Sequence, residues 1–158
     1  MISFEVYAVA NRSPAELWAL VGDFSRLAEW TDADAVEGPP EPPYTVGQRF
    51  RTTDQGRGRM WTVITAPQTQ DGRGDPYLVE VKTDDIDCGR LGIGIRVAHD
   101  PLGARLILAG LLDPLSKGEA ATSWTGRRKT TAGRLVHMPR IRSRFDRWTA
   151  RAVSAKRA

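Results

Sequence analysis

The chain has 158 residues, 41% of them hydrophobic and 27% charged, and its formal net charge is +4. That length suits a single domain spanning 1–158 and excludes two full domains, while the hydrophobic content excludes a disordered chain. The longest uncharged apolar run, Leu106–Leu112, is far too short to cross a bilayer, and the single cysteine, Cys88, has no intramolecular disulfide partner. Because no secretory leader is evident at the start of the sequence, we expect a cytoplasmic location.

The first residues predict a strand followed by two short helices. Residues 3–10 are rich in β-branched and aromatic side chains with nearly alternating polarity, which favours a strand. Ser13, Pro14 and Glu16 then supply an N-cap hydroxyl, a proline at the first helical position and an acidic residue three places after the cap. A helix is expected from this point, and 24–30 is typical of a second, shorter helical segment that runs into a strand.

The middle of the chain predicts an antiparallel meander. Four prolines within 38–43 indicate a surface loop, since proline cannot sit in a central strand. Segments with strand character then follow one another, separated by turn-rich sequence. They are 46–53, 60–66, 77–83, 91–99 and 105–112. The last two form the clearest predicted hairpin, because 91–99 alternates almost perfectly and a Pro-Leu-Gly turn separates the pair.

The end of the chain predicts a long amphipathic helix. Apolar residues recur at spacings of three and four, which places them on one side of a helix that starts near Met138, with Pro139 in its first turn. These residues are Met138, Ile141, Phe145, Trp148 and Ala152. The preceding segment, 113–132, fits either an irregular crossing or one more strand around Ala121–Arg127.

Charge is distributed unevenly along the sequence. Residues 126–158 carry 11 basic side chains and a single acidic one, whereas the rest of the chain is net negative. Four arginines of the predicted helix, Arg140, Arg144, Arg147 and Arg151, form a ridge beside its apolar stripe. Such a ridge could weakly contact an anionic membrane, or it could be solvated or paired with the acidic body of the protein. Without exposed aromatics or a recognised motif, nucleic-acid binding is not expected.

The order of these elements predicts an α+β fold in which the terminal helix covers one face of the sheet. The stretch from Ser13 to Phe24, continuing to Trp30 and then from Val46 to Phe50, resembles the START-like (SRPBCC, Bet v 1-like) superfamily of polyketide cyclase/dehydrase and lipid-transport proteins. The resemblance implies a helix-grip fold, in which a curved antiparallel sheet of about six or seven strands wraps the C-terminal helix around an apolar cavity. It also implies a hydrophobic ligand such as a lipid or polyketide, and in a minority of members cyclisation, dehydration or hydrolysis.

The strand pleat independently favours an apolar cavity, since alternate residues from 91 to 97 place large aliphatic side chains on one face. Aromatic residues before and within the strands are further candidates to line it. The expected ligand-binding residues are Trp30, Phe50, Trp61, Tyr77, Ile93, Ile95, Val97 and Phe145. The alternative interpretation is that these side chains are ordinary core.

Candidate catalytic groups are few. His99, next to Asp100, could be a general base at the cavity edge, and Arg51 could position an enol or carbonyl group. A histidine at the end of a strand is also typical of an exposed or capping residue. His99, His137 and Cys88 do not have the spacing of a zinc site, and no phosphate-binding loop is present, so neither a metal nor a cofactor is expected.

Three functions therefore remain open from the sequence. The first is binding of a hydrophobic small molecule, and the second is a cyclase or dehydratase acting on a polyketide-like substrate in the same cavity. The third is contact of the basic helix with an anionic membrane or nucleic acid.

Overall fold

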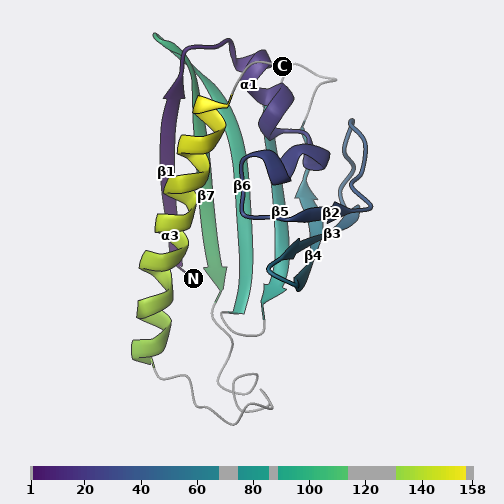
Figure 1. Ribbon diagram of the computed structural model, residues 1–158, viewed down its shortest axis with the longest axis vertical. Helices are drawn as coiled ribbons and strands as arrows, with labels where there is room; N and C mark the ends of the chain where they lie inside the picture. The colour runs from purple at the N-terminus through teal and green to yellow at the C-terminus, as the bar shows by residue number, and fades with distance from the viewer. Residues whose placement is uncertain (1, 68–74, 86–88, 114–130, 156–158) are drawn as a thin grey trace.

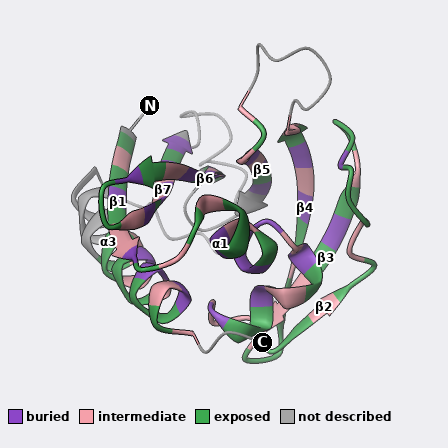
Figure 2. Cartoon of the chain, turned by 90° about the horizontal axis from the view of Figure 1, so that it is seen from above, coloured by how far each residue is buried: buried purple, intermediate pink, exposed green. Residues whose placement is uncertain are grey.

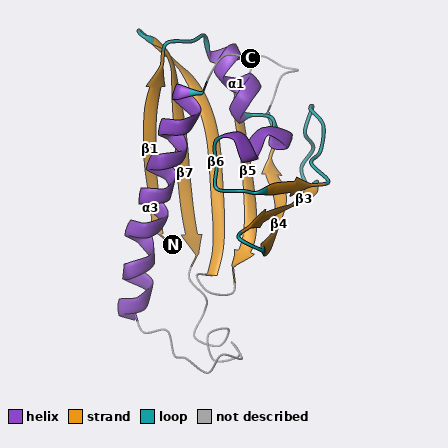
Figure 3. Ribbon diagram, in the orientation of Figure 1, coloured by secondary structure: helices purple, strands orange, loops and turns teal. Residues whose placement is uncertain are grey.

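The computed structural model describes residues 2–67, 75–85, 89–113 and 131–155, and it contains a seven-stranded antiparallel sheet (Figures 1 and 3). The strands are β1 (Ile2–Ala10), β2 (Ala35–Glu37), β3 (Arg49–Asp54), β4 (Arg57–Thr65), β5 (Leu78–Asp85), β6 (Gly89–Asp100) and β7 (Gly103–Asp113). Their order across the sheet is β1-β7-β6-β5-β4-β3-β2, so the first strand lies beside the last. Seen from above, the sheet curls from β1 to β2 and encloses a concave inner face (Figure 2).

Three helical segments accompany the sheet. They are α1 (Pro14–Val21), the 3-10 helix η1 (Phe24–Glu29) and α3 (Thr131–Ser154). The hydroxyl of Ser13 accepts a hydrogen bond from the Glu16 N–H at 3.2 Å, which confirms the predicted N-cap of α1. The long helix α3 runs along β1 and β7 (Figure 1). This arrangement is the predicted helix-grip fold.

The prediction for the start of the last helix was wrong. The helix begins at Thr131 rather than near Met138, so Pro139 lies within it and not in its first turn. A proline inside a helix removes one backbone donor and its ring crowds the carbonyl four residues earlier, which kinks or weakens a helix without always ending it. The possible strand at 121–127 and Cys88 lie outside the described residues.

Strand alternation builds the core on the concave face. In β6, Leu91, Ile93, Ile95 and Val97 are buried, whereas Arg96 on the opposite face is exposed. The same period of two recurs in β7, because a pleated strand presents successive side chains to opposite faces. One face of the sheet is therefore available to enclose a cavity, and the other faces solvent.

Tyr44 ties the loop before β3 to the end of α1. Its buried hydroxyl donates to the Gly22 carbonyl at 2.6 Å and accepts from the Phe24 N–H at 3.1 Å. Its ring stacks on Phe24 with centroids 4.4 Å apart. This contact fixes η1 over the concave face.

We expect Tyr44→Phe to lower the free energy of unfolding by about 1–3 kcal/mol, because it leaves a buried carbonyl and a buried N–H without their partner. Urea denaturation measures the change. Tyr7→Phe is the matched control, since Tyr7 is 65% exposed and its variant should unfold like the parent protein. A Tyr44 variant as stable as the control would contradict the bridging role.

Candidate functional site

A cavity of about 300 Å³ lies between the concave face of the sheet and α3. Its described lining comes from η1 and the segment after it, from strands β3 to β7 and from α3. Apolar side chains form most of the wall; they are Phe24, Leu27, Trp30, Ala33, Phe50, Trp61, Val81, Leu91, Ile93, Ile95, Leu108, Ile141, Phe145 and Trp148. The volume falls at the lower end of the range for small-molecule sites.

Aromatic rings stiffen the wall on both sides. Phe24 stacks on Phe50 with ring centroids 4.6 Å apart, and Phe145 stacks on Trp148 at 5.2 Å. Trp30 meets the Trp148 ring edge-on at 6.5 Å. Rings held by such contacts keep the cavity shape largely preformed, which lowers the cost of ordering the site when a ligand binds.

The polar part of the lining is dominated by arginine. We refer to Arg57 and Arg59 of β4 and Arg140 and Arg144 of α3 as the arginine rim, and all four line the cavity. Asp54 is the acidic member of the described lining. The remaining polar members are two threonine side chains, from the segment after η1 and from β3.

Local backbone geometry explains how β4 supplies its two arginines. Gln55 and Gly56 both have positive φ, 48° and 76°, and form the two-residue turn that joins β3 to β4. After this turn, Arg57 and Arg59 alternate with outward residues and share the inner face with Trp61. The hairpin thus carries charge at its tip and an aromatic ring deeper in the cavity.

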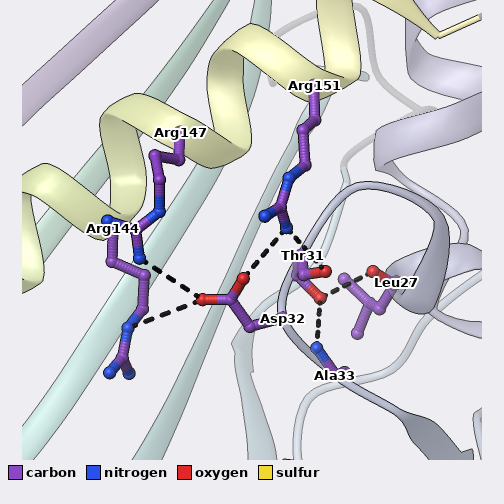
Figure 4. A network of polar contacts seen from close by, with 7 residues as sticks. All are labelled: Leu27, Thr31, Asp32, Ala33, Arg144, Arg147 and Arg151. Carbon is purple, nitrogen blue, oxygen red and sulfur yellow. Dashed lines mark hydrogen bonds and ion pairs between the residues drawn. The ribbon is translucent and has the colours of Figure 1, made fainter.

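An ion-pair cluster joins α3 to the segment after η1 (Figure 4). Asp32 lies 2.9 Å from Arg151, 3.7 Å from Arg144 and 3.8 Å from Arg147. Arg151 also donates to the backbone carbonyl of Thr31 at 3.3 Å. Three of the four arginines in the predicted ridge are thereby paired with the acidic body of the protein.

The cluster has a definite effect on Asp32. Partial burial works to raise its pKa, but the nearby indole N–H of Trp148 and the positive charges of Arg151 and Arg147 outweigh this and hold the pKa below its usual value. A carboxylate with a lowered folded-state pKa adds stability above its unfolded pKa of about 4, and that stability is lost as the pH falls through the lower folded value.

We therefore expect Asp32→Asn to lower the free energy of unfolding by about 1 kcal/mol at pH 7, because one charged hydrogen bond and two longer ion pairs are lost at a partly exposed site. The difference should shrink in 1 M salt and below pH 4. Asp146→Asn, which removes an exposed carboxylate of α3, is the control. Equal effects of the two variants in denaturant titrations at each pH would contradict the specific pairing.

Two buried donors adjoin the cavity. The indole Nε1 atoms of Trp30 and Trp148 have no partner that meets hydrogen-bond geometry, although Trp148 Nε1 lies near the Asp32 carboxylate. An unpaired buried N–H costs free energy. Both nitrogens are shielded from solvent, so neither N–H is presented to the interior of the cavity.

The structure brings together six of the eight predicted ligand-binding residues. Trp30, Phe50, Trp61, Ile93, Ile95 and Phe145 all line the cavity. Tyr77 and Val97 do not belong to the lining. Val97 donates its N–H to the Tyr77 carbonyl at 3.0 Å, and the Tyr77 ring contacts Trp18 of α1 at 5.7 Å. These two residues therefore pack at the end of the sheet that α1 covers.

The two candidate catalytic residues lie outside the lining. His99 is exposed at the end of β6, and its neighbour Asp100 accepts hydrogen bonds from Arg105 at 2.9 Å and from the Leu102 N–H at 3.0 Å. Asp100 thus stabilises the β6–β7 turn through these two hydrogen bonds. Arg51 is exposed on the outer face of β3, where its side chain lies over Gly58.

The prediction missed the arginine rim as part of a site. The sequence analysis places Arg140 and Arg144 only in a charged ridge and predicts no role for Arg57 or Arg59. Arg57, Arg59 and Trp61 follow one another at steps of two residues, and this period is the sequence signal for the second pair, since it places all three on one strand face. Trp148 could have been found from the apolar stripe of the helix.

The described residues lack both a metal-binding cluster and a membrane-spanning helix. They contain no group of three or more histidine, cysteine, aspartate or glutamate side chains arranged to hold a metal ion. Within the same ranges, no helix is long and apolar enough to cross a membrane.

Solved structures share this fold. The chain is similar to the Zhui aromatase/cyclase from Streptomyces sp. R1128 (TM-score 0.68, 12% identity, covering 96% of this chain and 91% of that one). It is also similar to the di-domain ARO/CYC BexL from the BE-7585A biosynthetic pathway (TM-score 0.70, 13% identity, 99% of this chain and 50% of that one). Ara h 8.0201 matches with a TM-score of 0.57 at 8% identity, covering 97% and 98% of the two chains.

No protein-family model and no curated protein sequence matches the chain. The structural neighbours confirm the predicted resemblance to the START-like, Bet v 1-like superfamily in its fold. At such low identity the likeness extends to the fold alone, and function must be argued from the site.

Proposed function

We propose that this protein binds a hydrophobic, ring-containing small molecule in the cavity between the sheet and α3. The observation that carries the proposal is the cavity itself, about 300 Å³ with a largely apolar and aromatic wall. Burial of apolar surface supplies the driving force, and the many aromatic side chains of the lining favour a ring-containing ligand. The aromatase/cyclase neighbours, whose names imply ring-forming chemistry, support a ligand of this kind.

Native mass spectrometry of the protein purified from its own host tests the proposal. We expect a mass increment that corresponds to a bound apolar molecule and that disappears after denaturation and refolding. A protein that carries no such molecule, and that binds none of the aromatic probes described below, would overturn the proposal.

Catalysis on a polyketide-like substrate is the second candidate, favoured by the same aromatase/cyclase neighbours. Neither His99 nor Arg51 supports it, since both lie outside the cavity lining. Asp54 is the carboxylate of the described lining and hence the general-base candidate. Asp54→Asn should keep affinity for the co-purified molecule but lose its conversion if the protein is an enzyme. If the parent protein leaves that molecule unchanged, binding alone remains.

A further inference from the structure

The arginine rim gives the cavity a charge that an entirely neutral ligand does not need. Among the described residues, four arginines line the cavity together with one carboxylate, Asp54. Asp32 adds a second carboxylate close to Arg144, at 3.7 Å. Four positive charges against two negative ones leave the rim net positive even when both carboxylates are counted.

The rim charges come from two elements on different sides of the cavity. Arg57 and Arg59 lie two residues apart on the inner face of β4, and Arg140 and Arg144 lie one helical turn apart on α3. Arg57 and Arg140 are exposed, whereas Arg59 and Arg144 are half-buried. The positive charge is therefore placed where the apolar wall meets solvent.

We infer that the ligand is an amphiphile whose apolar, ring-containing body lies in the cavity and whose oxyanion lies against the arginine rim. This inference rests on the proposed function and adds the chemical class of the ligand. Guanidinium groups bind carboxylate and phosphate oxygens through paired hydrogen bonds, and these contacts are stronger beside apolar walls that exclude water. Phe50 and Trp61 supply such walls beside the β4 arginines.

Calorimetric titration with matched probes tests the inference. The acidic probes are benzoate, 2-naphthoate and 2-naphthyl phosphate, and the neutral probes are methyl benzoate and methyl 2-naphthoate. We expect at least one acid to bind about tenfold more tightly than its methyl ester or, for the phosphate, than methyl 2-naphthoate, because a charge-assisted hydrogen bond contributes roughly that much. Comparison of the affinities for 2-naphthoate and 2-naphthyl phosphate shows whether the rim prefers a carboxylate or a phosphate.

Substitutions in the arginine rim test whether these arginines cause the preference for the acidic probe over the ester. Arg140→Gln and Arg59→Gln should each reduce the preference for the acid while leaving the affinity for the ester within about twofold. Arg142→Gln removes an equal charge from an exposed position of α3 outside the lining, and it should leave both affinities unchanged. Circular dichroism checks that each variant is folded, and Arg140→Gln, at an exposed position, keeps the test valid if Arg59→Gln fails to fold.

The outcomes separate this inference from the proposed function. Esters that bind as tightly as acids, or a preference for the acid that survives in both rim variants, would overturn the inference and leave a binder of neutral molecules. If neither acids nor esters bind and no ligand co-purifies, both the inference and the proposed function are overturned.

Discussion

Replacing Phe145 with alanine is expected to lower the free energy of unfolding by about 3–5 kcal/mol, the range measured when a fully buried phenylalanine is truncated. Phe145 is 1% exposed, and its ring lies 5.2 Å from the rings of both Phe4 and Trp148. It therefore joins α3 to β1 as well as forming part of the cavity wall. Removing it loosens the helix that closes the cavity.

Urea denaturation measures the loss, and Ser143→Ala is the control variant. Ser143 is exposed two residues away on the same helix, and its change should alter stability by less than about 0.5 kcal/mol. A loss below about 1 kcal/mol for Phe145→Ala would mean that α3 is not packed on the sheet as described.

Filling the cavity should weaken ligand binding strongly without unfolding the protein. Ile93 lies in the central part of β6, opposite Val81 and Gly110 in the strand register, and it lines the cavity. In Ile93→Trp the larger ring enters existing space, so we expect the affinity for the tightest probe to fall about 100-fold, equivalent to about 2.7 kcal/mol. The free energy of unfolding should fall by about 1–3 kcal/mol, the usual range when side-chain volume is added to a packed core.

Ile64→Trp is the matched control, since Ile64 lies on the outer face of β4 and is 39% exposed. Calorimetric titration of both variants, with thermal melting to confirm folding, completes the test. An Ile93 variant that binds as tightly as the control would show that the ligand lies elsewhere.

Sequence reasoning could find the strands and the cavity wall because both depend on local alternation. The period of two in β6 identifies Ile93 and Ile95, and the helical spacing of three and four identifies Phe145. Tyr77 is predicted for the cavity wall but lies outside the described lining, since its contact with Trp18 depends on where α1 crosses the sheet. No local pattern reports that crossing.

The ion-pair cluster and the arginine rim could not be predicted either, because both join residues that are far apart in the sequence. Asp32 is more than a hundred residues from Arg151, and the sequence around it has no feature that marks a partner on the last helix. The rim likewise requires the β3–β4 hairpin and α3 to meet at one cavity. Such sites form from the tertiary arrangement, whereas the wall follows from periodicity.

The pairing of β1 with β7 has a consequence for biosynthesis. Phe4 pairs with Gly110 in the sheet register, so β1 waits for a partner made roughly a hundred residues later, several seconds at ordinary translation rates. The helix that carries Phe145 and Trp148 is translated later still. Until α3 is translated, nothing on this helix can cover β1 and β7, so a nascent chain arrested before α3 would lack a closed cavity.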